Sequence, residues 1–198
     1  MNFYDKTKDD YDNGVEWHFQ KTFSYDWSKQ LDRFVKILKG TKVLDAGCGA
    51  PRDIYLFLKN HIEVEGIDYS EEAINKCRSL FPNLTFYVGD FRKINVPDEY
   101  YDGVWACASI LNLSKKDLPA ALKEFLRILK PGGVLFASVK VGQDEKMIPD
   151  EYGQRLFSFY SEDELKKFFE NAGAKVVHSE VVSDELLTGV LSDKPGWI

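Results

Sequence analysis

The sequence predicts an α/β fold in which helices cover both faces of a doubly wound, mostly parallel β-sheet. Short runs rich in β-branched and aromatic residues alternate with segments whose apolar residues recur at helical spacing. The run VLDAGCGAPRD, residues 43–53, places a Gly-x-Gly turn between an apolar strand and a helix. Sheets of this kind bind ligands at the carboxyl ends of their strands, so this turn marks the expected binding crevice.

The first half of the chain contains four expected strands. An amphipathic helix with an apolar stripe that includes Leu31, Phe34 and Leu38 ends at Gly40, before the first strand. Ser70 has the residue type and position of a helix N-cap. The strands are expected at residues 43–46, 63–67, 84–88 and 103–106, with helices at about 52–60 and 70–80 connecting the first three.

The second half repeats the alternation. Ser114 with Asp117 resembles a capping box, and the helix after it ends at the Pro-Gly-Gly of residues 131–133, before a strand over 134–139. Ser161 with Glu164 forms a second candidate capping box, whose helix ends at Gly173 and leads to a sixth strand over 175–182. Between these parts, the polar loop of residues 142–153 is placed to close over the crevice.

Composition limits the domain count and the partners. With 198 residues, 44% of them hydrophobic, the chain has the size of one domain, which we expect to span residues 1–198 with a helical cap over about 1–40. A formal charge of −6 gives no general attraction to phosphate backbones, so nucleic acid is not an expected partner. No apolar run approaches the roughly 20 residues of a membrane helix, and the acidic amino terminus lacks a signal peptide's apolar core. A cytoplasmic location without membrane contact is therefore expected.

The cysteines and histidines show neither a disulfide framework nor metal-ligand spacing. Cys48, Cys77 and Cys107 are an odd number of widely spaced cysteines, which fits a reducing cytoplasm. We interpret Cys48 and Cys107 as small buried residues rather than nucleophiles. The three histidines are scattered, so the sequence predicts no metal site.

Four segments, in order, carry a resemblance to a known family. Asp45-Ala46-Gly47-Cys48-Gly49 resembles the first motif of the class I S-adenosylmethionine (SAM)-dependent methyltransferases. EGIDYS at residues 65–70 and GDF at 89–91 resemble the second and third motifs, and LKPGG at 129–133 resembles the turn into strand 5. The resemblance implies a Rossmann-like methyltransferase fold with seven strands, the last one antiparallel between strands 5 and 6, and SAM as cofactor.

The first two motifs would hold the ribose and methionine ends of that cofactor. Gly47 and Gly49 lack a Cβ, so the backbone can approach a ligand closely. Asp68 follows Asp45 by 68 − 45 = 23 residues and ends strand 2, where nucleotide-binding folds place the acid that accepts both ribose hydroxyls. Asp45 either orders the glycine turn or meets the methionine amino group, and both interpretations stay open.

The later motifs would hold the adenine. By resemblance, Asp90 accepts from the adenine amino group while the Phe91 backbone recognises a ring nitrogen. Tyr69 either covers the adenine face or packs in the core. Ala106 and Cys107 would line the methionine side. The full predicted set of cofactor-binding residues is Asp45, Gly47, Cys48, Gly49, Asp68, Tyr69, Asp90, Phe91, Ala106 and Cys107.

The chain departs from the family pattern in two places. Pro51 stands where many members carry a third glycine, which alters the approach to the methionine end. Trp197 and Ile198 end the sequence where the last strand would begin. Either residues 186–191 supply that strand, or the sheet keeps a pairable edge through which two copies could form a homodimer.

The resemblance implies SAM-dependent methyl transfer to a small-molecule acceptor with an O, N or S nucleophile. No catalytic residue is assigned. Two alternatives remain: a non-catalytic cofactor-binding or regulatory module on the same fold, and an NAD-dependent oxidoreductase. The second is disfavoured because Arg52 takes the third glycine position of G-x-G-x-x-G. If the acceptor needs a base, the candidates are Tyr4, Tyr11, His18 and Tyr160.

Overall fold

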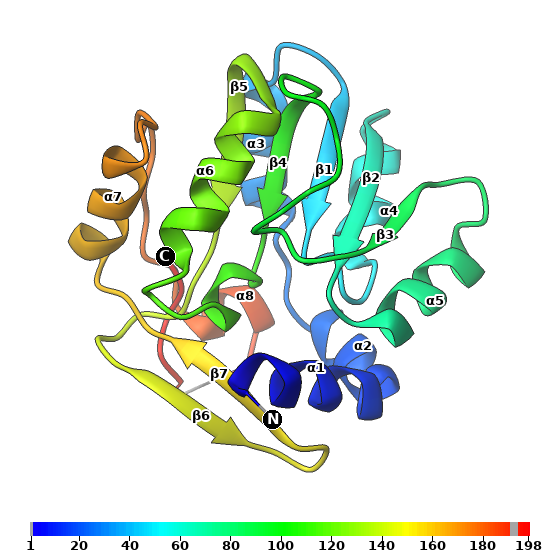
Figure 1. Ribbon diagram of the computed structural model, residues 1–198, viewed down its shortest axis with the longest axis vertical. Helices are drawn as coiled ribbons and strands as arrows, with labels where there is room; N and C mark the ends of the chain where they lie inside the picture. Colours follow the sequence, from blue (N-terminus) through cyan, green and yellow to red (C-terminus); the bar gives the residue numbers. More distant parts are fainter. Residues whose placement is uncertain (1, 191–193) are drawn as a thin grey trace.

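The computed structural model describes residues 2–190 and 194–198. At its centre lies a sheet of five parallel strands in the order β3-β2-β1-β4-β5 (Figure 1). The prediction of a parallel α/β sheet is thereby confirmed. The strands are β1 (Lys42–Ala46), β2 (Glu63–Asp68), β3 (Phe86–Val88), β4 (Tyr101–Ala106) and β5 (Leu129–Ala137).

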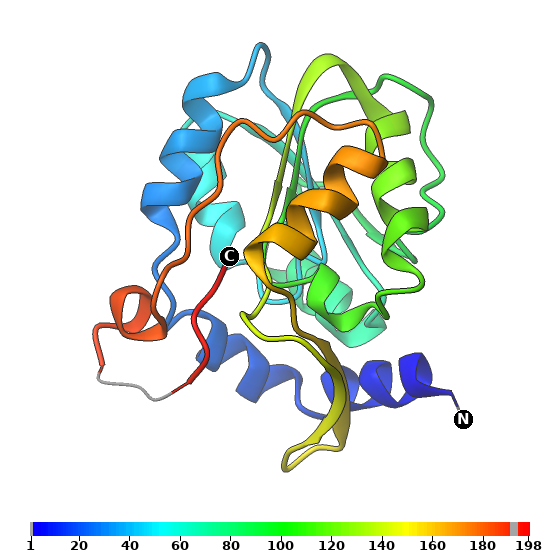
Figure 2. The same cartoon turned by 90° about the vertical axis from the view of Figure 1, so that its left-hand side faces the viewer.

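Helices cover both faces of this sheet. Figure 2 shows α3 and α4 on one side of the strands and α6 on the other. None of the described helices combines the length and apolarity needed to cross a lipid bilayer. The helices are α1 (Phe3–Asn13), α2 (Val15–Thr22), α3 (Ser28–Ile37), α4 (Arg52–Lys59), α5 (Glu71–Leu80), the short 3₁₀ helix η1 (Ile110–Asn112), α6 (Leu118–Ile128), α7 (Glu162–Asn171) and α8 (Asp184–Thr188).

Side-chain caps fix where several of these helices begin. The Ser70 hydroxyl accepts a hydrogen bond from Ala73 N at 3.0 Å, and the Ser161 hydroxyl accepts one from Glu164 N at 3.2 Å, as their N-cap positions predict. Ser114 is not the N-cap of α6. Its hydroxyl accepts a hydrogen bond from Asp117 N at 3.2 Å, which closes a turn before the helix, and α6 starts at Leu118 with Asp117 at the N-cap position.

Trp105 on β4 is the centre of the core between the sheet and helices α3 and α4. Its side chain is fully buried and stacks on Phe136 of β5 at 3.8 Å between ring centroids. The edges of Phe34 from α3 and Phe57 from α4 pack against it. Its indole N–H donates to Asp53 at 2.7 Å, so the one polar group of this cluster is satisfied.

In the described residues the central sheet contains five strands, so it does not show the seven strands that the resemblance implies. Residues 175–181 form no strand, and in the described part of the chain no backbone hydrogen bond involves them. A strand needs a paired neighbour, and this segment has none. The strand predicted over 186–191 is also wrong, since α8 occupies much of it, with Ser183 as N-cap; Leu191 lies outside the described residues.

The carboxyl-terminal residues nevertheless pair with two other segments. Val139, just past β5, exchanges two backbone hydrogen bonds of 3.0 Å with Ile198. Val182 exchanges two of 2.7 Å with Trp197. Both pairings are antiparallel, so residues 196–198 lie as a short middle strand between the end of β5 and Val182.

The polar loop predicted over 142–153 contains part of a hairpin that the sequence pattern did not indicate. Strands β6 (Glu145–Pro149) and β7 (Gln154–Ser158) pair antiparallel and form a separate two-stranded sheet. The hairpin lies beside α1, and Leu156 N donates to the Thr7 hydroxyl at 3.0 Å (Figure 1). The short KMIP run ends in a proline, which weakened the strand signal.

Candidate active site

The turn after β1 requires glycine at position 47. Gly47 has φ +80°, and the backbone N–H groups of Gly47 and Cys48 both donate to the Ile67 carbonyl, at 2.7 and 3.1 Å. A Cβ on Gly47 would lie 2.3 Å from the Ser109 Cβ, so close contact as well as backbone conformation excludes a side chain. Gly49 has φ +41°, but its Cβ would meet no atom closer than 3.8 Å.

This difference predicts unequal effects of alanine at the two glycines. Gly47→Ala is expected to lower the free energy of unfolding by about 1–3 kcal/mol, because an overpacked contact adds to the strain of a positive φ. Gly49→Ala should lower the free energy of unfolding by less, since only the strain of its positive φ applies and no atom crowds the new Cβ. Adding Ser109→Gly to Gly47→Ala should recover part of the loss in urea unfolding; no recovery would mean that the contact with Ser109 is not the cause.

Asp68, at the end of β2, faces the glycine turn with both carboxylate oxygens oriented. Gly49 N donates to Oδ2 at 2.8 Å, and Ser70 N donates to Oδ1 at 2.8 Å. Burial raises the pKa of Asp68, and these two N–H groups oppose the rise. Each oxygen keeps a lone pair for a further donor, so the carboxylate is suited to accept from two neighbouring hydroxyl groups.

Nine of the ten predicted cofactor residues line one hollow at the carboxyl ends of the strands. Ala106 is the exception: its side chain is fully buried within β4, and only residues beyond the end of that strand turn into the hollow. Ala106 therefore does not line this hollow. The residues that the fold brings together are Asp45, Gly47, Cys48, Gly49, Asp68, Tyr69, Asp90, Phe91 and Cys107.

Helices α1 and α2 lie across the mouth of this hollow, next to the carboxyl ends of β1 and β2 (Figure 1). Asp12 of α1 accepts a hydrogen bond from the Ser70 hydroxyl at 2.6 Å, beside Asp68. The hollow has a volume of about 160 Å³. Clefts that hold drug-sized ligands measure roughly 300–1,000 Å³, so this hollow is smaller than such a cleft.

Asp90 lies in the hollow but its carboxylate already has a cationic partner. Arg92 Nε lies 3.0 and 2.9 Å from the two Asp90 oxygens, and the Arg92 backbone N–H donates at 2.8 Å. The guanidinium also lies 4.3 Å from the ring centroid of Tyr4 on α1. An adenine amino group at Asp90 would therefore share the carboxylate with Arg92.

Arg52 is a site residue whose role the sequence did not indicate. Its largely buried guanidinium lines the hollow. Nε and Nη2 donate to the two carboxylate oxygens of Asp53, and Nη1 donates to the Thr22 carbonyl at 3.2 Å. The guanidinium also lies 3.4 Å from the Cys107 sulfur. The nearby buried hydroxyl of Ser109 has no hydrogen-bond partner in the described part of the chain. A guanidinium and an unpaired hydroxyl suit a ligand carboxylate.

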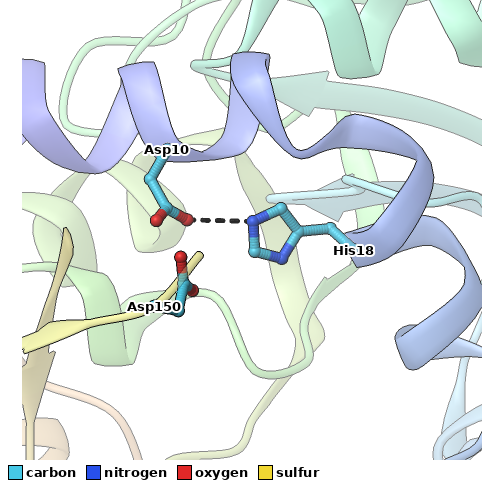
Figure 3. A group of neighbouring side chains, drawn as sticks. All are labelled: Asp10, His18 and Asp150. Carbon is cyan, nitrogen blue, oxygen red and sulfur yellow. Dashed lines mark hydrogen bonds and ion pairs between the residues drawn. The ribbon is translucent and has the colours of Figure 1, made fainter. Parts of the chain in front are cut away.

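A buried charge network supports the hollow from the α1 side. Figure 3 shows Asp10, His18 and Asp150 converging, with His18 Nε2 2.9 Å from Asp10 Oδ1. Their ligand atoms lie within 4.8 Å of one another, but Arg155 Nε lies 3.0 Å from Asp10 and its Nη2 lies 3.0 Å from Asp150. Since the Arg155 guanidinium already lies against both acids, the geometry favours an ion-pair network over a metal centre.

The network sets the protonation of its members. Burial lowers the pKa of His18 to about 4, and the charge of Arg155 adds to this effect, so the imidazole is neutral at pH 7. Burial raises the pKa of Asp10 to about 7. Burial alone would also raise the pKa of Asp150. Hydrogen bonds that Asp150 accepts from Asp10 and from other donors instead lower its pKa to about 2. Asp150 thus favours the charged carboxylate, whereas the environment of Asp10 favours its protonated form.

The candidate bases divide between the hollow and the core. Tyr4, Tyr11 and His18 line the hollow, whereas Tyr160 is fully buried elsewhere. The Tyr11 hydroxyl donates to Asn112 Oδ1 at 3.0 Å and accepts from Arg155, and burial raises its pKa. Tyr160 is thereby excluded from direct contact with a ligand in this hollow.

The fold is an α/β sheet with a hollow at the carboxyl ends of its strands, and comparisons with known proteins add to this description. Residues 43–133 match the family model described as "Methyltransferase domain". The chain is 30% identical over 171 residues to a sterol 24-C-methyltransferase of Aspergillus fumigatus, covering 75% of this chain and 43% of that protein. It is 29% identical over 180 residues to a demethylmenaquinone methyltransferase of Staphylococcus aureus, covering 74% and 73%.

A solved structure agrees with these matches. The 1,6-didemethyltoxoflavin-N1-methyltransferase of Burkholderia thailandensis superposes with a TM-score of 0.75 at 17% identity, over 98% of this chain and 86% of that one, which shows the shared fold. The chain spans less than half the length of the first curated relatives it matches, 43% and 37% for two of them. The methyltransferase-domain match and the named methyltransferase relatives support the class I SAM-dependent methyltransferase family for this chain.

Proposed function

We propose that this chain binds SAM in the hollow below β1, β2 and β4 and transfers its methyl group to a small-molecule acceptor. One observation carries the proposal. The glycine turn at residues 47–49 and the doubly oriented carboxylate of Asp68 face the same hollow, with Gly49 N hydrogen-bonded to Asp68. This combination provides close backbone approach beside an acceptor for two ribose hydroxyls.

The other site residues have complementary roles in this proposal. Arg52 and the unpaired hydroxyl of Ser109 would bind the carboxylate of the methionine part. Asp45, buried at the end of β1, would accept from the methionine amino group. Asp90 would accept from the adenine amino group, and the half-exposed ring of Tyr69 would cover the adenine face.

When bound, SAM supplies a methyl group on a cationic sulfur, and that charge is lost as the methyl moves to the acceptor. The protein's contribution is mainly to align the acceptor atom and to exclude water. Tyr4, Tyr11 and Phe19 are placed to do both, because they line the hollow from helices α1 and α2. We propose residues 1–198 as one methyltransferase unit in which α1 and α2 swing outward to admit ligands.

The aromatic lining of the cap favours an acceptor with a ring or an apolar chain. The sterol and demethylmenaquinone methyltransferases that the chain resembles are named for acceptors of this type, which supports the same class here. A phenol, hydroquinone or amine attached to an apolar body would fit. Nucleic acid is not proposed as an acceptor, because the chain carries a net charge of −6.

The test is a transfer assay in which SAM is mixed with phenols, hydroquinones, sterols and amines, and S-adenosylhomocysteine is measured by mass spectrometry. The expected result is product that depends on both acceptor and protein, and that falls in Asp68→Ala but not in the exposed-site control Asp163→Ala. SAM binding without product from any acceptor would favour a non-catalytic cofactor-binding module. NAD binding with no SAM binding would favour the oxidoreductase alternative.

A further inference from the structure

Helix α1 is fastened at both ends to residues that stand next to the two acids of the proposed adenosine site. Near its carboxyl end, Asp12 accepts a hydrogen bond of 2.6 Å from the hydroxyl of Ser70. Near its amino end, the ring centroid of Tyr4 lies 4.3 Å from Cζ of Arg92. Between these two points the helix lies across the mouth of the hollow (Figure 1). Ser70 and Arg92 are therefore two points at which α1 meets the rim of the cofactor site.

These two fastening residues share one local geometry. Ser70 follows Asp68 by two residues, and its backbone N–H donates to Asp68 Oδ1 at 2.8 Å. Arg92 follows Asp90 by two residues, and its backbone N–H donates to Asp90 Oδ1, also at 2.8 Å. Bonds of this kind form Asx turns, which hold the carboxylate relative to the chain. Each acid is thus oriented by the residue whose side chain also reaches α1.

Arg92 makes the contact at the amino end of α1 a charged one. Its Nε donates to both Asp90 oxygens, at 3.0 and 2.9 Å, and its Nη1 lies 3.4 Å from Asp117 Oδ2. The Tyr4 hydroxyl donates to the same oxygen of Asp117, so the phenol ring is held over the guanidinium. A cation over the face of a tyrosine is attracted by the ring. A change in the position of the Asp90 carboxylate would therefore move the cation that lies against Tyr4.

Ser70 makes the contact at the other end through its hydroxyl. That hydroxyl donates to Asp12 and accepts from Ala73 N as the N-cap of α5, so its orientation is fixed from two sides. Asp12 lies outside the set of residues that line the hollow. Asp12 can therefore act on a ligand in the hollow only through Ser70, through the position of α1, or by its charge.

We propose that Ser70 and Arg92 are positioning residues that couple binding of the adenosine part of SAM to the closure of α1. The inference rests on the proposed function, since it takes Asp68 and Asp90 as the acids that receive the ribose hydroxyls and the adenine amino group. A ligand that holds these two carboxylates in their present orientation also holds the side chains that fasten α1. By linkage, closure of α1 strengthens adenosine binding by the same factor.

The direct test is to loosen one fastening point from the side of the helix. Asp12→Ala removes the acceptor of the Ser70 hydroxyl without changing a residue that lines the hollow. It is expected to weaken S-adenosylhomocysteine binding about five- to tenfold in calorimetry, the lower end of the range typical of coupled sites. Asp12→Asn loses the charge but keeps an acceptor oxygen, so it should bind nearly as well as the wild type. Asp9→Ala, which removes an exposed acid from the same helix, should bind like the wild type.

Two further readouts separate coupling from a merely structural role. Methylthioadenosine has the adenosine part but lacks the methionine amino and carboxylate groups, so Asp12→Ala should weaken its binding by the same factor. S-adenosylhomocysteine should slow amide exchange in α1 of the wild type, and much less in Asp12→Ala at equal saturation. Arg92→Met keeps much of the stem but not the charge, and it should also lose most of this protection.

Equal affinity of Asp12→Ala and the wild type for both ligands would overturn the proposal. A loss confined to S-adenosylhomocysteine would do the same, because it would place the effect at the methionine end. If Asp12→Ala does not fold, full protection of α1 in ligand-saturated Arg92→Met is the result that contradicts the coupling. No binding of S-adenosylhomocysteine to the wild type would instead overturn the proposed function itself, and this inference with it.

Discussion

Replacing Asp68 with alanine is expected to weaken SAM binding by about ten- to a hundredfold. Hydrogen bonds to a charged acceptor are worth roughly 1.5–3 kcal/mol net, and a tenfold change in affinity corresponds to about 1.4 kcal/mol. Asp68 is partly buried, and the N–H groups of Gly49 and Ser70 hold both of its oxygens in place. The loss therefore removes an acceptor that is already oriented before the ligand arrives.

Isothermal titration calorimetry with SAM and S-adenosylhomocysteine measures this effect. Asp68→Asn, which keeps the size and one acceptor oxygen, should fall between the wild type and Asp68→Ala. Asp163→Ala, an exposed acid in the first turn of α7, should bind like the wild type. Unchanged affinity in a folded Asp68→Ala variant would remove Asp68 from the site.

Replacing Arg155 with methionine is expected to lower the free energy of unfolding by about 3–5 kcal/mol. The guanidinium is buried and lies 3.0 Å from both Asp10 and Asp150. Without it, the Asp150 carboxylate and the buried carboxyl group of Asp10 face each other with no cation between them, and the loss of one partner of a buried ion pair has costs of this size. Because Arg155 belongs to β7 and Asp10 to α1, the change should also release α1 from the hairpin.

Urea unfolding and amide exchange in α1 measure the two consequences. A triple variant that adds Asp10→Asn and Asp150→Asn removes the unbalanced charge and should regain most of the lost stability. Met at position 155 retains much of the volume of the arginine stem, so packing alone does not account for the expected loss. A loss below about 1 kcal/mol would mean that the network contributes little to holding the cap.

The sequence was sufficient to predict the parts of the fold that depend on local pattern. Strands β1, β2 and β4 and helices α4 and α5 appear within a few residues of their expected limits because periodicity, glycine turns and caps are local signals. Gly47, Gly49 and Asp68 came together for the same reason, since the carboxyl ends of parallel strands share one edge. Ala106, just inside its strand, does not line the hollow.

The rest depends on contacts between distant residues. Lys175 to Val182 reads as a strand, but a strand forms only with a partner, and beside β5 that position is a groove. Arg52 enters the hollow because the helix after Pro51 turns it inward. Arg155 and Asp10 meet across 145 residues of sequence, 155 − 10 = 145, and no local spacing indicates such a pair.

The most direct test of the account is a calorimetric titration of the wild-type chain with SAM, and separately with NAD. We expect one SAM site per chain. Amide exchange in α1 and α2 should be faster in the free chain, when the cap opens, than in the SAM-bound chain. Exchange at residues 47–49 should become slower once SAM is bound. NAD should produce no binding heat. Absence of SAM binding, or protection at residues other than the glycine turn and Asp68, would contradict the central claim.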